Sequence, residues 1–117
     1  MTMIDFGTAP DELSHALTRV EALLRSRFKV SMTLPLPEGK LLYGRRDDCW
    51  GLFVQTNGNW YDAAEAPLKQ RTAAAKALPE LIQGLKSLQE AIMHEMLEAA
   101  ELANKMANNL EEEIRHV

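Results

Sequence analysis

A chain of 117 residues is long enough for one domain with a buried core, and its content of 46% hydrophobic and 26% charged residues argues against a disordered or fibrous protein. The net charge of −4 at pH 7 disfavours nucleic acid and anionic lipid as partners of the whole chain. No apolar run spans a bilayer, and the N-terminal sequence lacks the features of a signal peptide. We therefore predict a single cytoplasmic domain over residues 1–117.

The first predicted element is a helix over residues 8–27. Thr8 is a suitable N-cap, Pro10 falls in the first turn, and Asp11 occupies the capping-box position three residues after Thr8. From Leu13 to Leu24 the apolar residues recur at steps of three and four, which is the spacing of one buried helix face.

Residues 28–62 are predicted to form an antiparallel sheet. Alternation from Phe28 to Leu34 indicates a half-buried strand, and "PLPEG" at 35–39 predicts a turn. Two more strands, "KLLYGR" (40–45) and "WGLFVQ" (50–55), flank the tight turn signal "RRDDC". The Asn57-Gly58 pair is a strong hairpin signal, so a short fourth strand can follow it. The expected arrangement is a meander of three or four strands.

Residues 67–116 are rich in strong helix formers, with Pro79 in their interior. A proline inside a helix removes a hydrogen bond and clashes with the preceding turn. We therefore predict two C-terminal helices with a break near Pro79, the second of them unusually long. The predicted fold class is α+β: an N-terminal helix, the meander and these two helices.

Apolar residues beyond Pro79 follow an eleven-residue repeat with steps of four, three and four, which is typical of a nearly straight helix. A helix from 79 to 115 would be about 55 Å long and would extend past a domain of this size. A second copy of the chain is the expected cover for its apolar stripe. The predicted dimer interface consists of Ile92, Met96, Ala99, Ala103, Met106, Ala107 and Leu110. The alternative is a turn near "NKMANN" or near residue 90 that folds the segment back as a hairpin.

Most aromatic side chains fall in the predicted sheet, next to two arginines. Trp, Tyr and Arg dominate protein interfaces and can stack on bases, so one interpretation is a recognition face, and the other is simply a hydrophobic core. The predicted binding residues are Trp50, Trp60, Tyr61, Arg45 and Arg46.

No enzyme motif stands out. "HEMLE" (94–98) resembles the H-E-x-x-H zinc motif, with Glu98 in place of the second histidine, but it supplies too few ligands. The single Cys49 cannot form an intrachain disulfide, which agrees with a reducing compartment, and it lacks the flanking signature of a catalytic cysteine. We predict no catalytic residue, no metal site and no cofactor.

Residues 39–85, "GKLLYGRRDDCWGLFVQ…APLKQRTAAAKALPELIQGL", resemble short uncharacterised proteins of bacterial phages and prophages, in which a "WGL" strand precedes an Arg-Ala-rich helix and "LP.L". The resemblance covers less than half of the chain and implies no activity and no site residues. It favours a small accessory or host-interaction factor.

The main functional hypothesis is a non-enzymatic homodimer that joins through its last helix and presents its sheet to another macromolecule, most simply a protein. The second is a small-molecule or nucleotide-binding protein that uses the aromatic and arginine side chains at a dimer cleft. The third is a nucleic-acid-binding protein that uses Arg25, Arg27, Lys29, Arg45 and Arg46, and it predicts a steep salt dependence of binding.

Overall fold

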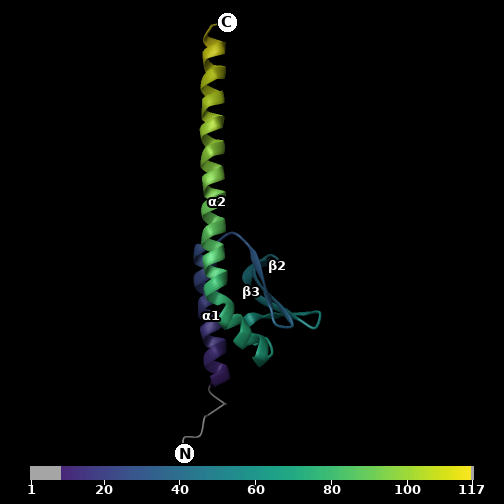
Figure 1. The fold of residues 1–117 in the computed structure, drawn as a ribbon. Helices are drawn as coiled ribbons and strands as arrows, with labels where there is room; N and C mark the ends of the chain where they lie inside the picture. The colour runs from purple at the N-terminus through teal and green to yellow at the C-terminus, as the bar shows by residue number, and fades with distance from the viewer. Residues whose placement is uncertain (1–8, 117) are drawn as a thin grey trace, which may run out of the picture.

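The computed structural model describes residues 9–116 as an α+β protein (Figure 1), which confirms the predicted class. Two helices enclose one face of a four-stranded antiparallel sheet. In chain order the elements are α1 (Ala9–Arg27), β1 (Met32–Leu36), β2 (Gly39–Arg46), β3 (Cys49–Thr56), β4 (Asn59–Asp62), the single 3-10 turn η1 (Ala63–Glu65) and α2 (Leu68–Arg115). The predicted N-cap of α1, Thr8, lies outside the described residues.

The sheet is a meander in the order β1-β2-β3-β4, so the fourth strand predicted from Asn57-Gly58 is confirmed. Asn57 and Gly58 have φ values of 51° and 76°, and Asp47 and Asp48 have φ values of 51° and 64°. Two consecutive residues with positive φ form the mirror-image turn whose twist matches that of the strands it joins. Asn, Asp and Gly adopt this conformation at low cost, which explains why both hairpins could be found in the sequence.

The prediction for β1 was wrong at both ends. The strand starts at Met32, because the chain after α1 first makes one more helical hydrogen bond, from the Phe28 N–H to the Leu24 carbonyl (2.8 Å). Phe28 enters the core from this helix end, with 2% of its surface exposed. Pro35 lies inside β1, where a missing N–H is tolerated because β1 is an edge strand.

The core lies between the sheet and the two helices. Strands β2 and β3 contribute Leu41, Tyr43, Leu52 and Val54, all fully buried. Leu17 and Leu24 of α1 and Leu81 and Leu85 of α2 cover them. Gly84 of α2 packs against the end of the Met32 side chain of β1, which would have to move aside for a larger residue at position 84.

The predicted break at Pro79 was also wrong, because α2 continues through it from Leu68 to Arg115 and the protein has one C-terminal helix in place of two. A proline at an interior position costs roughly 3 kcal/mol. Ala74 before it and Leu81 and Leu85 after it are buried against the sheet and α1. This packing on both sides of the proline holds the two segments in one line.

Helix α2 extends far beyond the rest of the molecule (Figure 1), so the alternative of a hairpin within the segment is wrong. The structure measures 88 × 30 × 21 Å, and its radius of gyration is 21.4 Å. A compact domain of this length would have a radius of gyration of about 13 Å. Every residue from Glu90 to His116 is exposed. We call residues 9–89 the head and residues 90–116 the arm. Within residues 9–116, neither helix is long and apolar enough to cross a membrane.

Candidate functional site

A cleft of about 590 Å³ opens in the head where β4 ends. Strand β4 pairs with β3 only from Phe53 to Thr56, whereas β3 itself starts at Cys49. The first part of β3 therefore has a neighbour strand, β2, on one side only. The cleft follows this open edge between α1, the β2–β3 turn and the segment from β4 to η1.

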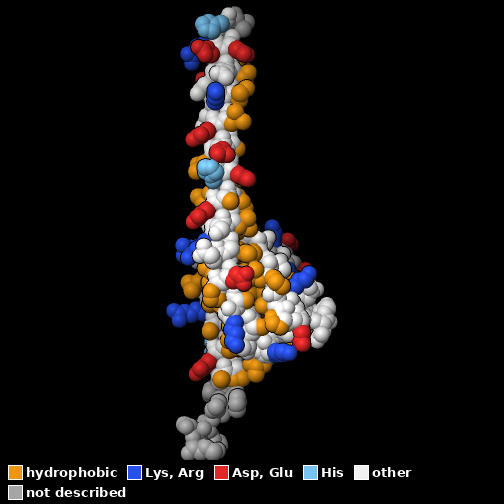
Figure 2. Space-filling view, viewed as in Figure 1, with side chains coloured by type: hydrophobic (Ala, Val, Ile, Leu, Met, Phe, Trp, Pro, Cys, Tyr) orange, Lys and Arg blue, Asp and Glu red, His pale blue; other side chains and the backbone are white. Residues whose placement is uncertain are grey.

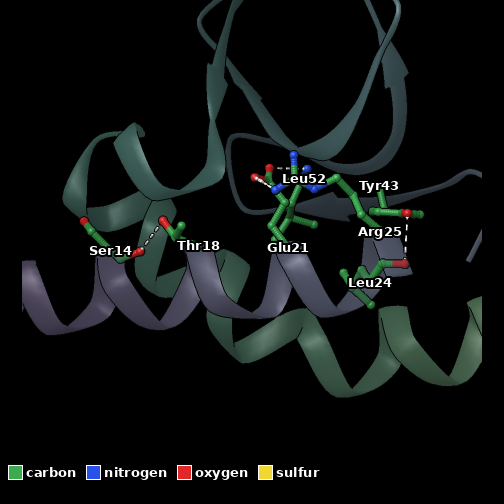
Figure 3. Close-up of polar contacts among 7 residues, drawn as sticks. All are labelled: Ser14, Thr18, Glu21, Leu24, Arg25, Tyr43 and Leu52. Carbon is green, nitrogen blue, oxygen red and sulfur yellow. Dashed lines mark hydrogen bonds and ion pairs between the residues drawn. The ribbon is translucent and has the colours of Figure 1, made fainter. Parts of the chain in front are cut away.

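Glu21 of α1 occupies part of the open edge (Figure 3). Its carboxylate accepts a hydrogen bond from the backbone N–H of Leu52 (2.7 Å) and lies 3.8 Å from the Arg25 guanidinium. Gly51 makes this approach possible, because a Cβ there would come within 2.9 Å of the carboxylate. Glu21 thus supplies the acceptor that a neighbouring strand would otherwise provide.

The bond to Glu21 also defines which other backbone groups face the cleft. Since the Leu52 N–H points to α1, its pairing with Tyr43 of β2 is a non-hydrogen-bonded one. Such pairs recur at every second residue of an antiparallel ladder. The pair of Trp50 with Arg45 is therefore of the same kind, and the Trp50 N–H and carbonyl are directed to the cleft.

Arg46 lies over two aromatic rings at one side of the cleft. Its guanidinium carbon is 4.5 Å from the ring centre of Trp60 and 5.4 Å from that of Phe53. The strand register places both rings on the sheet face opposite the helices, as the alternation with the buried Leu52 and Val54 requires. Phe53 is nevertheless only 9% exposed. The three side chains form a preassembled cation–π cluster at the surface.

Trp50 and Tyr61 belong to the other face, on the side of the helices. The Trp50 ring packs 5.7 Å from that of Tyr43, and the Lys29 ammonium lies 5.9 Å from its centre. Tyr61 is paired with Val54 and is half-buried. Both rings extend from the core to the cleft wall.

Tyr43 anchors this wall through its hydroxyl group. The hydroxyl donates to the carbonyls of Leu24 (3.1 Å, drawn in Figure 3) and Phe28 (2.8 Å) at the end of α1. Burial raises the pKa of Tyr43 above its usual value; the charge of Arg25 opposes this shift and that of Glu21 adds to it. The neutral hydroxyl is the form that fits the core.

Four of the five predicted binding residues line the cleft, namely Arg46, Trp50, Trp60 and Tyr61. Arg45 does not, because it pairs with Asp48 (3.0 Å) on the exposed β2–β3 turn. Glu21 also lines the cleft but was not among the predicted binding residues. Its position off the apolar stripe of α1 marks it only as a surface residue, and its role depends on where β4 ends.

The predicted interface residues all lie on the arm. Figure 2 shows hydrophobic side chains following one edge of the arm down to the head. We call the arm stripe the set Ile92, Met96, Ala99, Ala103, Ala107, Leu110 and Ile114, all of them exposed. Met106, also predicted for the interface, is 50% exposed beside the stripe. The stripe continues the row that contains the fully buried Leu81 and Leu85 in the head.

The basic residues do not form one patch. Arg25 pairs with Glu21, and Arg27 and Lys29 lie over the rings of Phe28 and Trp50 at the end of α1. The β2–β3 turn mixes its two arginines with Asp47 and Asp48. This arrangement lacks the continuous positive surface expected of a nucleic-acid-binding face.

The "HEMLE" motif lies on the arm, where the His94 Nε2 and a Glu98 carboxylate oxygen are 3.0 Å apart. Both side chains are largely exposed. Within residues 9–116, no three His, Cys, Asp or Glu side chains are grouped so that they could hold a metal ion. Cys49 is exposed at the start of β3.

Comparison with protein-family models, with curated proteins and with solved structures finds no match for this chain.

Proposed function

We propose that the protein is a non-enzymatic homodimer that joins through the arm stripe and binds another protein at the cleft of its head. The observation that carries the proposal is the continuation of the core-facing row of α2 onto the exposed arm. Above the head the row includes Met96, Leu110 and Ile114, which are 64%, 55% and 73% exposed. An extended apolar surface of this kind is rare on a monomer.

The gain from covering the stripe is large enough to hold two chains together. Burying a side chain such as Leu or Ile contributes about 1.5–3 kcal/mol. In a dimer each large residue of the stripe is buried in both chains, so its contribution is counted two times. Two-fold dimers are the most frequent soluble oligomers. Ala99, Ala103 and Ala107 allow the backbones of two helices to come close together in the middle of the arm.

The cleft supports the second half of the proposal. Its walls contain the cation–π cluster of Arg46, Trp60 and Phe53. They also contain the rings of Trp50 and Tyr61 and backbone groups at the open edge of β3. Rigid aromatic and arginine side chains in a partly desolvated pocket are the usual anchors of protein interfaces. An extended segment of a partner could pair with β3 at this edge if Glu21 moved aside. The resemblance to phage and prophage proteins favours a host protein as that partner.

The dimer is tested with the variant Met96→Glu/Ala103→Glu, which adds two charges to the middle of the stripe. We expect it to have the mass of one chain by light scattering at micromolar concentration, whereas the natural protein has the mass of two. The matched control is Lys105→Glu, which changes the charge by the same two units away from the stripe and should remain dimeric. An unchanged mass for the double variant would exclude the stripe as the interface.

A small-molecule ligand is the second candidate, because about 590 Å³ lies within the range of ligand pockets. Arg46 and Trp60 could hold an anionic aromatic ligand such as a nucleotide. Thermal unfolding in the presence of a panel of nucleotides tests this candidate. A nucleotide ligand would be favoured over a protein partner if a nucleotide raised the melting temperature of the natural protein and of Arg45→Ala but not that of Arg46→Ala. Melting temperatures that no nucleotide changes would count against it.

A further inference from the structure

We infer that two copies of the chain pair their arms antiparallel, with Ala103 of each chain facing Ala103 of the other at the two-fold axis. This inference rests on the proposed dimer and specifies its geometry. The partner is a second copy of the chain; one feature of the chain permits this arrangement, and two more favour it over a parallel pair.

The first feature is that the stripe is the same in both directions. Ala99 and Ala107 lie four residues on either side of Ala103, and Met96 and Leu110 lie seven residues on either side. Ile92 and Ile114 lie at eleven residues. An antiparallel pair centred on Ala103 therefore sets Ile against Ile, Met against Leu and Ala against Ala. Each layer has matched side-chain sizes, as close packing requires.

The second feature is the position of the head relative to the stripe. Leu81 and Leu85 belong to the same row of α2 and are covered by the sheet and α1. A partner helix on the stripe thus approaches from the side on which the head lies. In a parallel pair both heads would need the space between the helices, and they would collide. In an antiparallel pair each head lies beyond the end of the other chain's arm.

The lengths of the arm and the stripe agree with this geometry. With Ala103 at the axis, Ile114 of one chain faces Ile92 of the other, and the helix end at Arg115 stops about half a turn above Gln89. The Gln89 side chain holds the end of α1: it accepts from the Lys29 N–H (3.3 Å) and donates to the Arg27 carbonyl (3.2 Å). The partner's arm would end where the head begins.

The third feature is the charge at these two ends. Arg25, Arg27 and Lys29 are exposed at the end of α1, beside Gln89. The other end of the molecule carries Glu111, Glu112 and Glu113 against the single Arg115 in the last turns of α2, so it is net negative, and the helix dipole is also negative there. Antiparallel pairing separates the two acidic ends and sets Glu111 to Glu113 of one chain level with residues 93–95 of the other, about 6–9 Å along the axis from Gln89 and the basic side chains beside it. Parallel pairing would place the two acidic ends side by side.

Disulfide trapping tests the register. In a Cys49→Ser background, single cysteines are introduced by Ala99→Cys, Ala103→Cys or Ala107→Cys, and the proteins are oxidised. We expect Ala103→Cys alone to form a covalent dimer with twice the 13.2 kDa mass of the chain. Ala99→Cys and Ala107→Cys alone should stay unlinked, since their equivalents are about 12 Å apart along the axis. An exchanged mixture of these two variants should become linked.

Self-linking of Ala99→Cys and Ala107→Cys to the same extent as Ala103→Cys would overturn the antiparallel register while leaving the dimer intact. Monomeric mass for all the reduced variants and for the natural protein would instead refute the proposed dimer itself. Spin labels on the natural Cys49 give a second measurement without changes to the arm. The two labels should be about 40 Å or more apart, and a clearly shorter distance would contradict the inference.

Discussion

The head and the arm contain the same helix but differ in what covers its apolar row. In the head, Leu81 and Leu85 are 0% exposed against the sheet and α1, whereas Met96 and Ile114 on the arm are 64% and 73% exposed. The row stays apolar in both regions, although its middle on the arm consists of alanines. The comparison teaches that an apolar helix face needs a surface to cover it, and that the head covers this row only as far as Leu85, since Leu88 is already 39% exposed.

The difference between the head and the arm is tested most strongly by replacing one leucine in each region with alanine. Leu85→Ala leaves a cavity in a fully buried site and should lower the free energy of unfolding by about 2–5 kcal/mol at any protein concentration. Leu110→Ala should leave the head intact and lower the melting temperature only through the dimer, so its effect should depend on concentration. Thermal unfolding at several concentrations measures both. A concentration-independent loss for Leu110→Ala would contradict the proposed role of the arm.

Pro79 lies in the part of α2 that packs on the head, and its replacement should stabilise the protein. Pro79→Ala restores one backbone N–H donor inside a continuous helix at an exposed position, which should raise the free energy of unfolding by about 1–3 kcal/mol. Pro35→Ala is the matched control, because Pro35 lies on an edge strand and should change stability little. Urea unfolding of the two variants provides the measurement. A less stable Pro79→Ala protein would mean that the proline itself fits the helix to the head.

The open edge of β3 should depend on Glu21. Glu21→Ala leaves the partly buried Leu52 N–H without its acceptor and should cost about 1–3 kcal/mol. Glu21→Gln retains an acceptor oxygen and should cost less. Hydrogen exchange at the Leu52 amide is the direct readout, and it should become faster in Glu21→Ala than in Glu21→Gln. Equal exchange rates in the two variants would show that the carboxylate does not protect this edge.

The smallest expected effect is that of the Tyr43 hydroxyl. Tyr43→Phe removes the hydrogen bonds to the end of α1 and should cost about 0.5–1.5 kcal/mol at neutral pH. Because the pKa of Tyr43 is raised in the folded protein, the unfolded chain ionises first, and stability should fall as the pH rises above about 10. Tyr43→Phe should lose less stability over that pH interval than Tyr61→Phe. If both variants lose the same amount of stability at alkaline pH, the loss comes from groups other than Tyr43.

The sequence predicted the elements whose signals are local. Asn57-Gly58 and Asp47-Asp48 mark turns by their own backbone preferences, and the alternation around Leu52 assigned the two faces of β3 correctly. Errors arose where tertiary contacts decide the outcome. Pro79 has an unfavourable local effect that packing of Ala74 and Leu81 overcomes, and Phe28 joins the core from a helix end although its alternation pattern is that of a strand.

The candidate site was predictable in its residue types but not in its shape. The cluster of Trp and Arg residues in the sheet pointed to four residues of the cleft wall, including Arg46 and Trp60. The cleft itself exists because β4 stops at Asp62 while β3 extends to Cys49, and because Glu21 reaches the exposed edge. Strand lengths and a contact from a distant helix leave no local pattern in a sequence.

Sedimentation equilibrium of the unmodified protein at micromolar concentration tests the central claim most directly. If a second copy covers the arm, the measured mass is twice the 13.2 kDa of one chain, and it falls toward the mass of one chain on dilution. A mass of 13.2 kDa throughout the micromolar range, with the arm still helical, would contradict the account.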